Sequence, residues 1–301
     1  MASRRRKTSF QSVAIYTHNK PAKEKEETKF LEELLVFFES QGVETVHGDV
    51  RTVSLLKNKI HLIDDEQSYD LKIGIGGDGT LLKMMRTLQK KDGYLLGINF
   101  GSLGFLSELR PRKALEDMKR VFEGDFHVDE RMLLKAFVWR KDDRGRKEKI
   151  FRAYALNEIV LGHGGLARLT NFHVKANRRV LSTYRSDGLI FSTPTGSTAY
   201  SMSLGGPIIS PALQCILVHP VAPHTLSHRP IILPPKKVVH VHFEGRSEAI
   251  SMTIDGQIHF SIKPTDEVSI QTATRKAKFI RMRESHYFKT LRNKLAWGER
   301  K

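Results

Sequence analysis

The sequence contains a single cysteine and no long apolar run, and each shortage excludes a class of protein. With only Cys215 among its 301 residues, the chain can form neither an intrachain disulfide framework nor a cysteine-rich zinc site. No apolar run approaches the roughly 18 residues that a membrane-spanning helix requires. Residues 1–10 lack the apolar core of a secretory signal peptide. We therefore expect a cytoplasmic protein with no membrane partner.

Acidic residues are also in short supply, because 33 Asp and Glu face 50 Lys and Arg, for a formal net charge of +17. A charge of this size favours nucleic acid or phosphate-bearing ligands. Most of the excess lies at the two ends. Residues 1–10 carry a net charge of +4 and residues 271–301 carry +8, which leaves +5 for the other 260 residues. Basic ends are most often solvated tails, and a transit peptide is the alternative.

The length suggests two domains, at roughly 150 residues each. Up to about residue 123, strand-like apolar runs alternate with segments of helical periodicity, which predicts a parallel α/β sheet. Beyond Gly124, short runs that alternate apolar and polar residues predict an antiparallel β domain. Residues 279–297 return to helical spacing. We expect an α/β domain at 1–124 and a β-rich domain at 125–270.

A glycine-rich turn, Gly-Ile-Gly-Gly-Asp-Gly-Thr at residues 74–80, follows one of the apolar runs. It contains the G-x-G-x-x-G spacing of dinucleotide-binding Rossmann folds. Those folds place an acidic residue about 20 residues later, and residues 97–100 read Gly-Ile-Asn-Phe. We therefore do not predict a Rossmann dehydrogenase. Gly76 and Gly77 nevertheless allow close approach of the backbone to phosphate, which the start of the following helix also favours.

Asp78 is the unusual residue of this turn, because a carboxylate repels a bare phosphate. It suits a site that holds a cation, or one that removes a proton from an attacking hydroxyl. Alternatively, Asp78 only caps the following helix. The spacing alone leaves both interpretations open.

A second segment rich in Ser, Thr, Gly and Pro spans residues 185–207. Its hydroxyls and exposed backbone donors suit the recognition of sugar and phosphate, and Tyr200 could stack on a base. Asn157 and Glu158 lie in another apolar run and could hold ribose hydroxyls, although the run by itself favours a solvent-facing Glu158. The histidine pairs of the chain lack the spacing and the acidic ligand of a metal site.

Taken together, these segments resemble the NAD kinase family, in its bacterial form. GGDGT alone also occurs in phosphofructokinases and in lipid kinases of the diacylglycerol kinase type, whereas the whole set in this order is specific. Leu204 stands where family members often have alanine. The matching pieces are GGDGT at 76–80, INFGSLGFL at 98–106, NE at 157–158, SDGLIFSTPTGSTAYSMSLGGPI at 186–208, PHTLSHRP at 223–230 and DGQ at 255–257.

The resemblance implies transfer of a phosphoryl group from ATP to the 2′-hydroxyl of the NAD adenosine ribose, giving NADP. Mg²⁺ or another divalent cation would accompany ATP, with no protein residue assigned as its ligand. The resemblance also implies an α/β N-terminal domain with a parallel sheet, a β-rich, sandwich-like C-terminal domain, and a site between them. Residues 271–301 would pack back on the first domain, and the protein would be a homodimer or homotetramer.

The resemblance further implies roles for single residues. Asp78 would accept the proton or orient the hydroxyl, and Gly76, Gly77 and Thr80 would form the turn that holds the phosphate donor. The residues implied to bind NAD are Gly79, Asn157, Glu158, Arg168, Arg185, Asp187, Thr198, Ala199, Tyr200, Ser201, Met202, Ser203 and Gln257.

Two other functions remain as alternatives. A lipid kinase would share GGDGT but would not need the dinucleotide-adapted segment at 186–208. A nucleic-acid-binding protein would explain the charge, but the chain has none of the usual recognition motifs. We therefore expect NAD and ATP as ligands and no nucleic acid.

Overall fold

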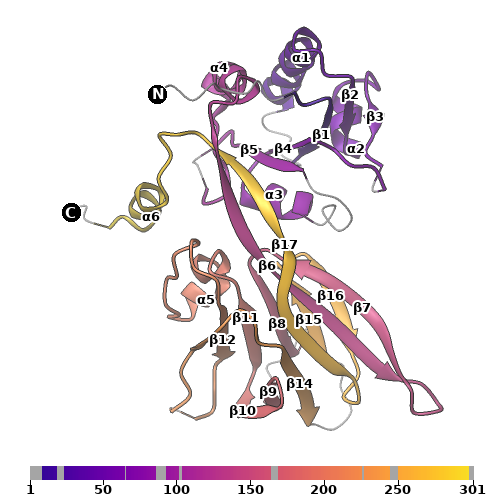
Figure 1. Cartoon of the computed structure of the whole chain (residues 1–301), viewed down its shortest axis with the longest axis vertical. Helices are drawn as coiled ribbons and strands as arrows, with labels where there is room; N and C mark the ends of the chain where they lie inside the picture. Colours follow the sequence, from indigo (N-terminus) through magenta and orange to yellow (C-terminus); the bar gives the residue numbers. More distant parts are fainter. Residues whose placement is uncertain are drawn as a thin grey trace. The chain divides into compact units, whose positions relative to one another are not determined.

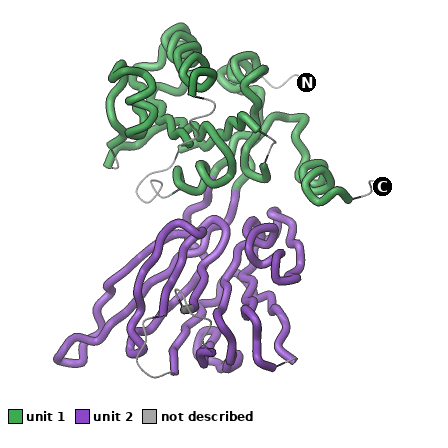
Figure 2. The backbone as a smooth tube through the Cα atoms, turned by 180° about the vertical axis from the view of Figure 1, so that it is seen from behind, with its two compact units in different colours: residues 1–130, 278–301 green, residues 131–277 purple. Residues whose placement is uncertain are grey.

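The computed structural model of the chain divides into two compact units, coloured green and purple in Figure 2. Unit 1 comprises residues 1–130 and 278–301, and unit 2 comprises residues 131–277. The chain passes from one unit to the other within two long strands, β6 (His127–Lys141) and β17 (Glu267–Arg281). The residues that the structure describes are 9–18, 24–64, 66–85, 93–101, 104–163, 169–225, 227–244 and 250–297.

Unit 1 is organised around a parallel sheet with the strand order β5-β4-β1-β2-β3, and the end of β17 pairs with β5 (Figure 1). The strands are β1 (Ser12–Thr17), β2 (Thr45–Gly48), β3 (His61–Leu62), β4 (Leu71–Ile75) and β5 (Tyr94–Ile98). β4 is buried along its whole length, as a central strand covered on both faces should be. The chain adds β2 and β3 on one side of β1 and then crosses over to add β4 on the other side. The sheet therefore has a topological switch point between β1 and β4, where α/β proteins commonly bind ligands.

The helices α1 and α4 cover this sheet with their apolar sides. The helix α1 buries Phe30, Leu31, Leu34 and Phe38, which recur at helical spacing. Together with buried side chains of α4, they form one cluster with β1, β4 and β5. None of the described helices is long and apolar enough to cross a membrane. The helices are α1 (Glu24–Ser40), α2 (Val50–Leu55), α3 (Asp78–Met85), α4 (Pro111–Phe122) and α6 (Tyr287–Leu295).

Unit 2 consists of two β-sheets built from antiparallel pairs such as β9–β10 and β8–β11. In the first, β10-β9-β14-β17 are neighbours and β6 joins β17 to β7; the second has the order β13-β12-β11-β8-β15-β16. A single apolar cluster takes side chains from both sheets, among them Val241 of β14 and Leu189 of β11, as in a β-sandwich. The remaining strands are β7 (Lys147–Ala155), β8 (Glu158–His163), β9 (Thr170–Ala176), β10 (Arg179–Ser186), β11 (Gly188–Ser192), β12 (Ile216–Val221), β13 (Ile231–Leu233), β14 (Val239–Glu244), β15 (Ile250–Ile254) and β16 (Ile258–Ile262).

This architecture confirms the predicted fold class, a parallel α/β part followed by an antiparallel β part. The prediction of helical structure from residue 279 onward is wrong at its start. β17 continues to Arg281, where Lys278 and Phe279 pair with Tyr94 and Leu95 of β5, and α6 begins only at Tyr287. The local spacing misleads here because pairing with a distant strand decides the conformation.

Candidate functional site

The glycine-rich turn lies directly after β4, at the switch point of the parallel sheet. Gly76 has φ +152, and a Cβ added there would lie 2.2 Å from Thr80 Oγ1 and 2.9 Å from His18 Cβ. Only glycine therefore fits this position. At Gly77 and Gly79, by contrast, an added Cβ would meet no described atom within 4 Å. The turn is closed on one side and open on the other, which leaves room for a ligand.

Both carboxylate oxygens of Asp78 accept hydrogen bonds from the backbone of a neighbouring loop. Phe105 N–H donates to Oδ2 at 2.8 Å, and Leu106 N–H donates to Oδ1 at 3.2 Å. Within the described parts of the chain, the donors to this carboxylate come from the loop rather than from the first turn of α3. Capping therefore does not explain where Asp78 points. A carboxylate can accept about four hydrogen bonds, so Asp78 keeps acceptor capacity for a cation or a hydroxyl.

Gly104 permits this contact, and the sequence analysis did not single it out. A Cβ at Gly104 would lie 1.9 Å from Asp78 Oδ1, so any larger residue would displace the carboxylate. The loop is closed internally, because Gly104 N–H donates to Ser107 Oγ at 2.7 Å and Gly101 N–H donates to Asn99 Oδ1 at 2.8 Å. The signal was present in the expected motif INFGSLGFL, whose second glycine is Gly104.

Thr80 is the other polar residue of the turn. It is buried, and its Oγ1 has no hydrogen-bond partner among the described residues. An unpaired buried hydroxyl costs about 1–3 kcal/mol. A polar ligand at the turn would offset that cost, so the residues present are compatible with a bound phosphate.

Among the described residues, a metal ion would need further ligand atoms from a bound substrate. No three His, Cys, Asp or Glu side chains of the described ranges gather into a metal site. Mg²⁺ is usually bound through one or two carboxylates together with substrate phosphates and water. The free acceptor capacity of Asp78 fits that pattern, whereas a zinc site made of protein ligands alone does not.

In unit 2, Asn157 and Glu158 are held by a carboxylate that the sequence analysis passed over. Asp255 accepts backbone N–H donors from Leu156, Asn157 and Glu158, at 2.9, 2.7 and 3.0 Å. Its own N–H donates to the carbonyl of Glu158 at 2.9 Å. Burial raises the pKa of Asp255 to about 6, although the three N–H donors partly offset this. The DGQ motif at 255–257 contains this aspartate, but only its Gln257 was expected to bind substrate.

Glu158 itself is buried, with 6% of its surface exposed. The interpretation from the local run, a solvent-facing carboxylate, is therefore wrong, because β8 is a central strand between β11 and β15. Burial, and secondly the charge of Asp255, raise the pKa of Glu158 to about 7. A hydrogen bond from the backbone N–H of Tyr200 partly offsets this rise. Its Oε2 has no hydrogen-bond partner among the described residues, so a ligand hydroxyl or amide could be its missing donor.

The segment rich in hydroxyls packs against this dipeptide. A Cβ at Gly196 would lie 2.1 Å from the carbonyl oxygen of Asn157, so glycine is required there. Thr193 Oγ1 donates to the carbonyl of Leu156 at 2.5 Å. The short helices η3 (Gly196–Thr198) and α5 (Tyr200–Ser203) follow.

Several hydroxyls of this segment bond within the protein, those of Ser197 and Ser201 among them. Ser197 Oγ donates to the carbonyl of Pro194 at 2.7 Å and accepts the N–H of Ile209 at 2.9 Å, which leaves it no role as a nucleophile. Ser201 Oγ lies 2.9 Å from Nδ1 of His219, and both residues are buried. Burial lowers the pKa of His219, which favours its neutral form as a partner for Ser201.

The other expected residues lie around these elements with different exposure. Arg185 and Tyr200 are exposed, and Asp187 and Gln257 are half-buried. Arg168 lies outside the described residues. Within unit 2 the structure thus brings Asn157, Glu158 and the backbone of Tyr200 together, and within unit 1 it brings the turn and the loop at 104–107 together. Thr198, Ala199 and Met202 are half-buried and Ser203 is exposed.

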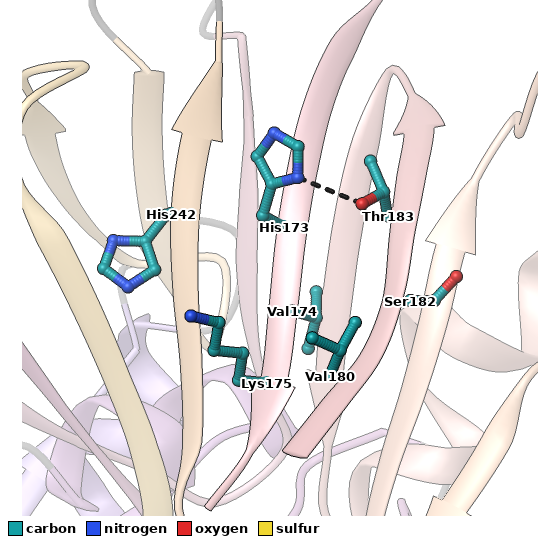
Figure 3. Close-up of a pocket in the computed structure, with 7 residues that line it drawn as sticks. All are labelled: His173, Val174, Lys175, Val180, Ser182, Thr183 and His242. Carbon is teal, nitrogen blue, oxygen red and sulfur yellow. Dashed lines mark hydrogen bonds between the residues drawn. The ribbon is translucent and has the colours of Figure 1, made fainter. Parts of the chain in front are cut away.

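A hollow of about 500 Å³ lies elsewhere in unit 2, over β9, β10 and β14 (Figure 3). It shares no residue with the expected site. His173 is satisfied within the protein there, because Nδ1 lies 3.0 Å from Thr183 Oγ1 and Nε2 lies 2.9 Å from Glu244 Oε2. The lining residues are His173, Val174, Lys175, Val180, Ser182, Thr183 and His242.

Comparison with known families matches both halves of the chain. Residues 8–126 match the ATP-NAD kinase N-terminal domain, and residues 156–282 match the ATP-NAD kinase C-terminal domain. The NAD kinase of Geotalea daltonii is 39% identical over 239 residues, covering 79% of this chain and 82% of that protein. The NAD kinase of Geobacter sulfurreducens is 40% identical over 231 residues, covering 77% of this chain and 80% of that protein.

Solved structures share the fold. Yeast NADH kinase complexed with NADH has a TM-score of 0.85 at 23% identity, covering 98% of this chain and 90% of that one. An NAD kinase from Archaeoglobus fulgidus in complex with ATP has a TM-score of 0.69 at 22% identity, covering 94% of this chain and 98% of that one. At these identities the likeness concerns the fold alone.

Proposed function

The chain belongs to the NAD kinase family, and from that premise we propose that it transfers the terminal phosphoryl group of ATP to the 2′-hydroxyl of the NAD adenosine ribose. The product is NADP, and the enzyme is a phosphotransferase. The observation that carries this proposal is Asp78, a carboxylate fixed by two loop N–H donors beside two glycines whose Cβ positions are open. Such a carboxylate can receive a proton from a hydroxyl acceptor without moving.

Unit 1 supplies the groups that act on the phosphate donor. Gly76, Gly77 and Thr80 form the turn on which the triphosphate rests, at the start of α3, where the helix dipole favours negative charge. Mg²⁺ or another divalent cation, bound with ATP, would supply charge stabilisation on the transferred phosphoryl group. Asp78 is the residue of the turn that suits contact with this cation. The protein residues thus orient and polarise the two substrates, while the bonds are exchanged between the substrates themselves.

Asp78 removes the proton of the 2′-hydroxyl as the oxygen attacks the γ-phosphorus. The new bond forms between that oxygen and phosphorus as the bond to the ADP oxygen breaks. A correctly placed general base contributes roughly 10²–10⁴ in rate. The two loop donors hold the carboxylate in the position that this role requires.

Unit 2 supplies the groups that bind NAD. Glu158 Oε2, which has no partner among the described residues, accepts a hydrogen bond from a hydroxyl of the adenosine ribose. Asn157 contacts the adenosine portion of NAD as well. Ser201 would contribute backbone rather than its hydroxyl, since that group bonds His219. The other residues proposed to contact NAD are Gly79, Arg168, Arg185, Asp187, Thr198, Ala199, Tyr200, Met202, Ser203 and Gln257.

The same proposal extends to the assembly and the setting of the protein. We expect a homodimer or homotetramer, acting in the cytoplasm, with neither nucleic acid nor membrane as partner. Multi-angle light scattering of the purified chain measures the assembly, and a monomer at micromolar concentration would contradict this part.

A panel of donors and acceptors tests the function. ATP, other nucleoside triphosphates and polyphosphate are each combined with NAD, NADH or diacylglycerol, and the phosphorylated product is identified by mass. We expect ATP and NAD to give NADP, with the phosphate on the 2′ position. Phosphorylation of diacylglycerol instead would favour a lipid kinase. Tight RNA binding at physiological salt without kinase activity would favour a nucleic-acid-binding protein.

A further inference from the structure

Arg281, the last residue of β17, is buried within unit 1 with 7% of its surface exposed. Its guanidinium donates to the carbonyl oxygens of Phe105, Leu106 and Ser107, at 2.8, 3.1 and 3.3 Å. Three consecutive carbonyls of one loop are therefore held by a single side chain. The same loop carries the two N–H groups that hold Asp78.

One peptide group connects the guanidinium to the carboxylate. The carbonyl of Phe105 accepts from Arg281, and the N–H of Leu106, which belongs to the same peptide plane, donates to Asp78 Oδ1. Because this group is planar, holding its oxygen also aims its N–H. Hydrogen bonds in series polarise one another, so the guanidinium strengthens the bond on the far side of the peptide.

Arg281 is itself fixed by two carboxylates. Glu108 Oε2 accepts from Nη1 at 3.0 Å, and Asp129 Oδ2 accepts from Nε at 3.3 Å. Glu108 also accepts the N–H of Met282 and the hydroxyl of Ser285, at 3.0 and 3.1 Å. The end of β17 and the loop are therefore joined by a closed set of hydrogen bonds.

A guanidinium is an expensive group with which to fill a buried space. Taking an ion out of water costs several kcal/mol, and an apolar side chain would pack there at no such cost. What the guanidinium adds is a planar fork of five N–H donors that can hold several oxygens in fixed directions. The property that this position gains from arginine is therefore the orientation of the loop backbone.

We propose that Arg281 is a positioning residue for phosphoryl transfer, which holds the 105–107 backbone so that its N–H groups keep the Asp78 carboxylate in place. The inference rests on the proposed function for its kinetic consequence. Arg281 touches no reacting atom, so it acts on the rate of the chemical step and not on the binding of either substrate.

The kinetic test compares the full-length wild type with Arg281→Met and Arg281→Lys. We expect Arg281→Met to lower kcat by about 10- to 100-fold, because small misplacements of a catalytic group have effects of that order. The KM values for NAD and ATP should change by no more than about twofold. Arg281→Lys should fall between, because an ammonium keeps the charge but cannot span three carbonyls. A wild-type kcat in Arg281→Met, or a rise in KM alone, would overturn the proposal.

Arg140→Met is the matched control for loss of a paired arginine. In unit 2, Arg140 makes two hydrogen bonds of 2.8 Å to the buried Asp266, so this variant should lose stability comparably. Assayed below the melting temperature of every variant, it should keep the wild-type kcat. An equal loss of kcat in Arg140→Met would show that general stability explains the effect.

Glu108→Gln weakens the hold on Arg281 more gently, and should lower kcat by about 3- to 10-fold. It replaces Arg281→Met if that variant does not fold.

Amide hydrogen exchange separates this inference from the proposed function. Exchange at Phe105 and Leu106 should be faster in Arg281→Met than in the wild type, and unchanged in Arg140→Met. This readout does not depend on turnover. If the wild type makes no NADP, the proposed function fails. If those amides keep wild-type protection without Arg281, the positioning role fails.

Discussion

The two units use one kind of hydrogen bond in opposite ways. In unit 1, two backbone N–H groups hold the Asp78 carboxylate, and that carboxylate is the group proposed to act. In unit 2, the Asp255 carboxylate holds the backbone N–H groups of Leu156, Asn157 and Glu158, and the last two of these residues are proposed to act. A carboxylate with backbone donors is therefore not by itself a sign of catalysis. The group proposed to act is the one with a free oxygen acceptor, which is Asp78 itself in unit 1 and Glu158 Oε2 in unit 2.

Asp78→Asn should have the largest effect. The amide cannot take a proton, so kcat should fall by roughly 10²–10⁴, while the circular dichroism spectrum stays that of the wild type. NADP formation at saturating ATP and NAD is the measurement. Asp142→Asn is the control, because Asp142 Oδ1 also accepts two backbone N–H donors, from Arg144 and Arg146. Near-normal turnover by Asp78→Asn would remove Asp78 from the mechanism.

Gly104→Ala should have the next largest effect. It moves the Asp78 carboxylate without changing its chemical nature, so it tests the importance of position alone. The added methyl would overlap Asp78 Oδ1, and the end of that side chain can move away at small cost to stability. We expect kcat to fall by roughly 10²-fold, with a melting temperature near that of the wild type. A large loss of stability with the remaining activity per folded molecule intact would contradict this.

Asp255→Asn should affect the binding of NAD rather than the rate of turnover. The amide nitrogen would face N–H donors, which loosens Leu156 to Glu158. We expect KM for NAD to rise about 10-fold, KM for ATP to stay unchanged, and the unfolding free energy to fall by about 1–3 kcal/mol. Initial rates at varied NAD and at varied ATP make the distinction. Equal changes in both KM values would show that the two units do not differ in the way described.

The last variant, Glu158→Gln, changes the pH dependence of stability. The pKa of Glu158 is about 7 in the folded protein and 4.5 in the unfolded chain, so the folded state binds this proton more tightly. The contribution of Glu158 to stability is therefore fully present below about pH 4.5 and is lost as the pH rises through 7. The decrease is at most about 3 kcal/mol.

Urea unfolding at pH 5 and pH 8 measures this difference. The wild type should lose more stability between the two pH values than Glu158→Gln, since the neutral amide has no proton to lose. Asp255 titrates in both proteins, and because its charge is coupled to that of Glu158, the comparison measures Glu158 together with this coupling. Identical losses would mean that Glu158 does not carry the buried charge.

Much of the fold was predictable because it depends on local pattern. The run at 71–75 is apolar apart from Lys72 and forms β4, buried along its length. Phe30, Leu31, Leu34 and Phe38 share one face of α1. The end of β17 was not predictable, since its pairing with Tyr94 and Leu95 joins segments far apart in the sequence.

The candidate site divides in the same way. The motifs at 76–80 and 157–158 were visible as residue types in an unusual order. Their supports were not, because Asp255 lies 98 residues from Asn157 and Arg281 lies 176 residues from Phe105. Glu158 looked solvent-facing because a period of two cannot show that β8 lies between two other strands.

From the sequence alone came the division into an α/β part and a β part, the family resemblance and the residues able to do chemistry. Periodicity and motif spacing are properties of neighbouring residues, so they survive without coordinates. Only the tertiary structure decided that Asp78 is held by Phe105 and Leu106, that Glu158 is buried with an unpaired oxygen, and that Arg281 aims a peptide group. These depend on angles and distances between segments far apart in the chain, which hydrogen bonding and desolvation determine once the chain has folded.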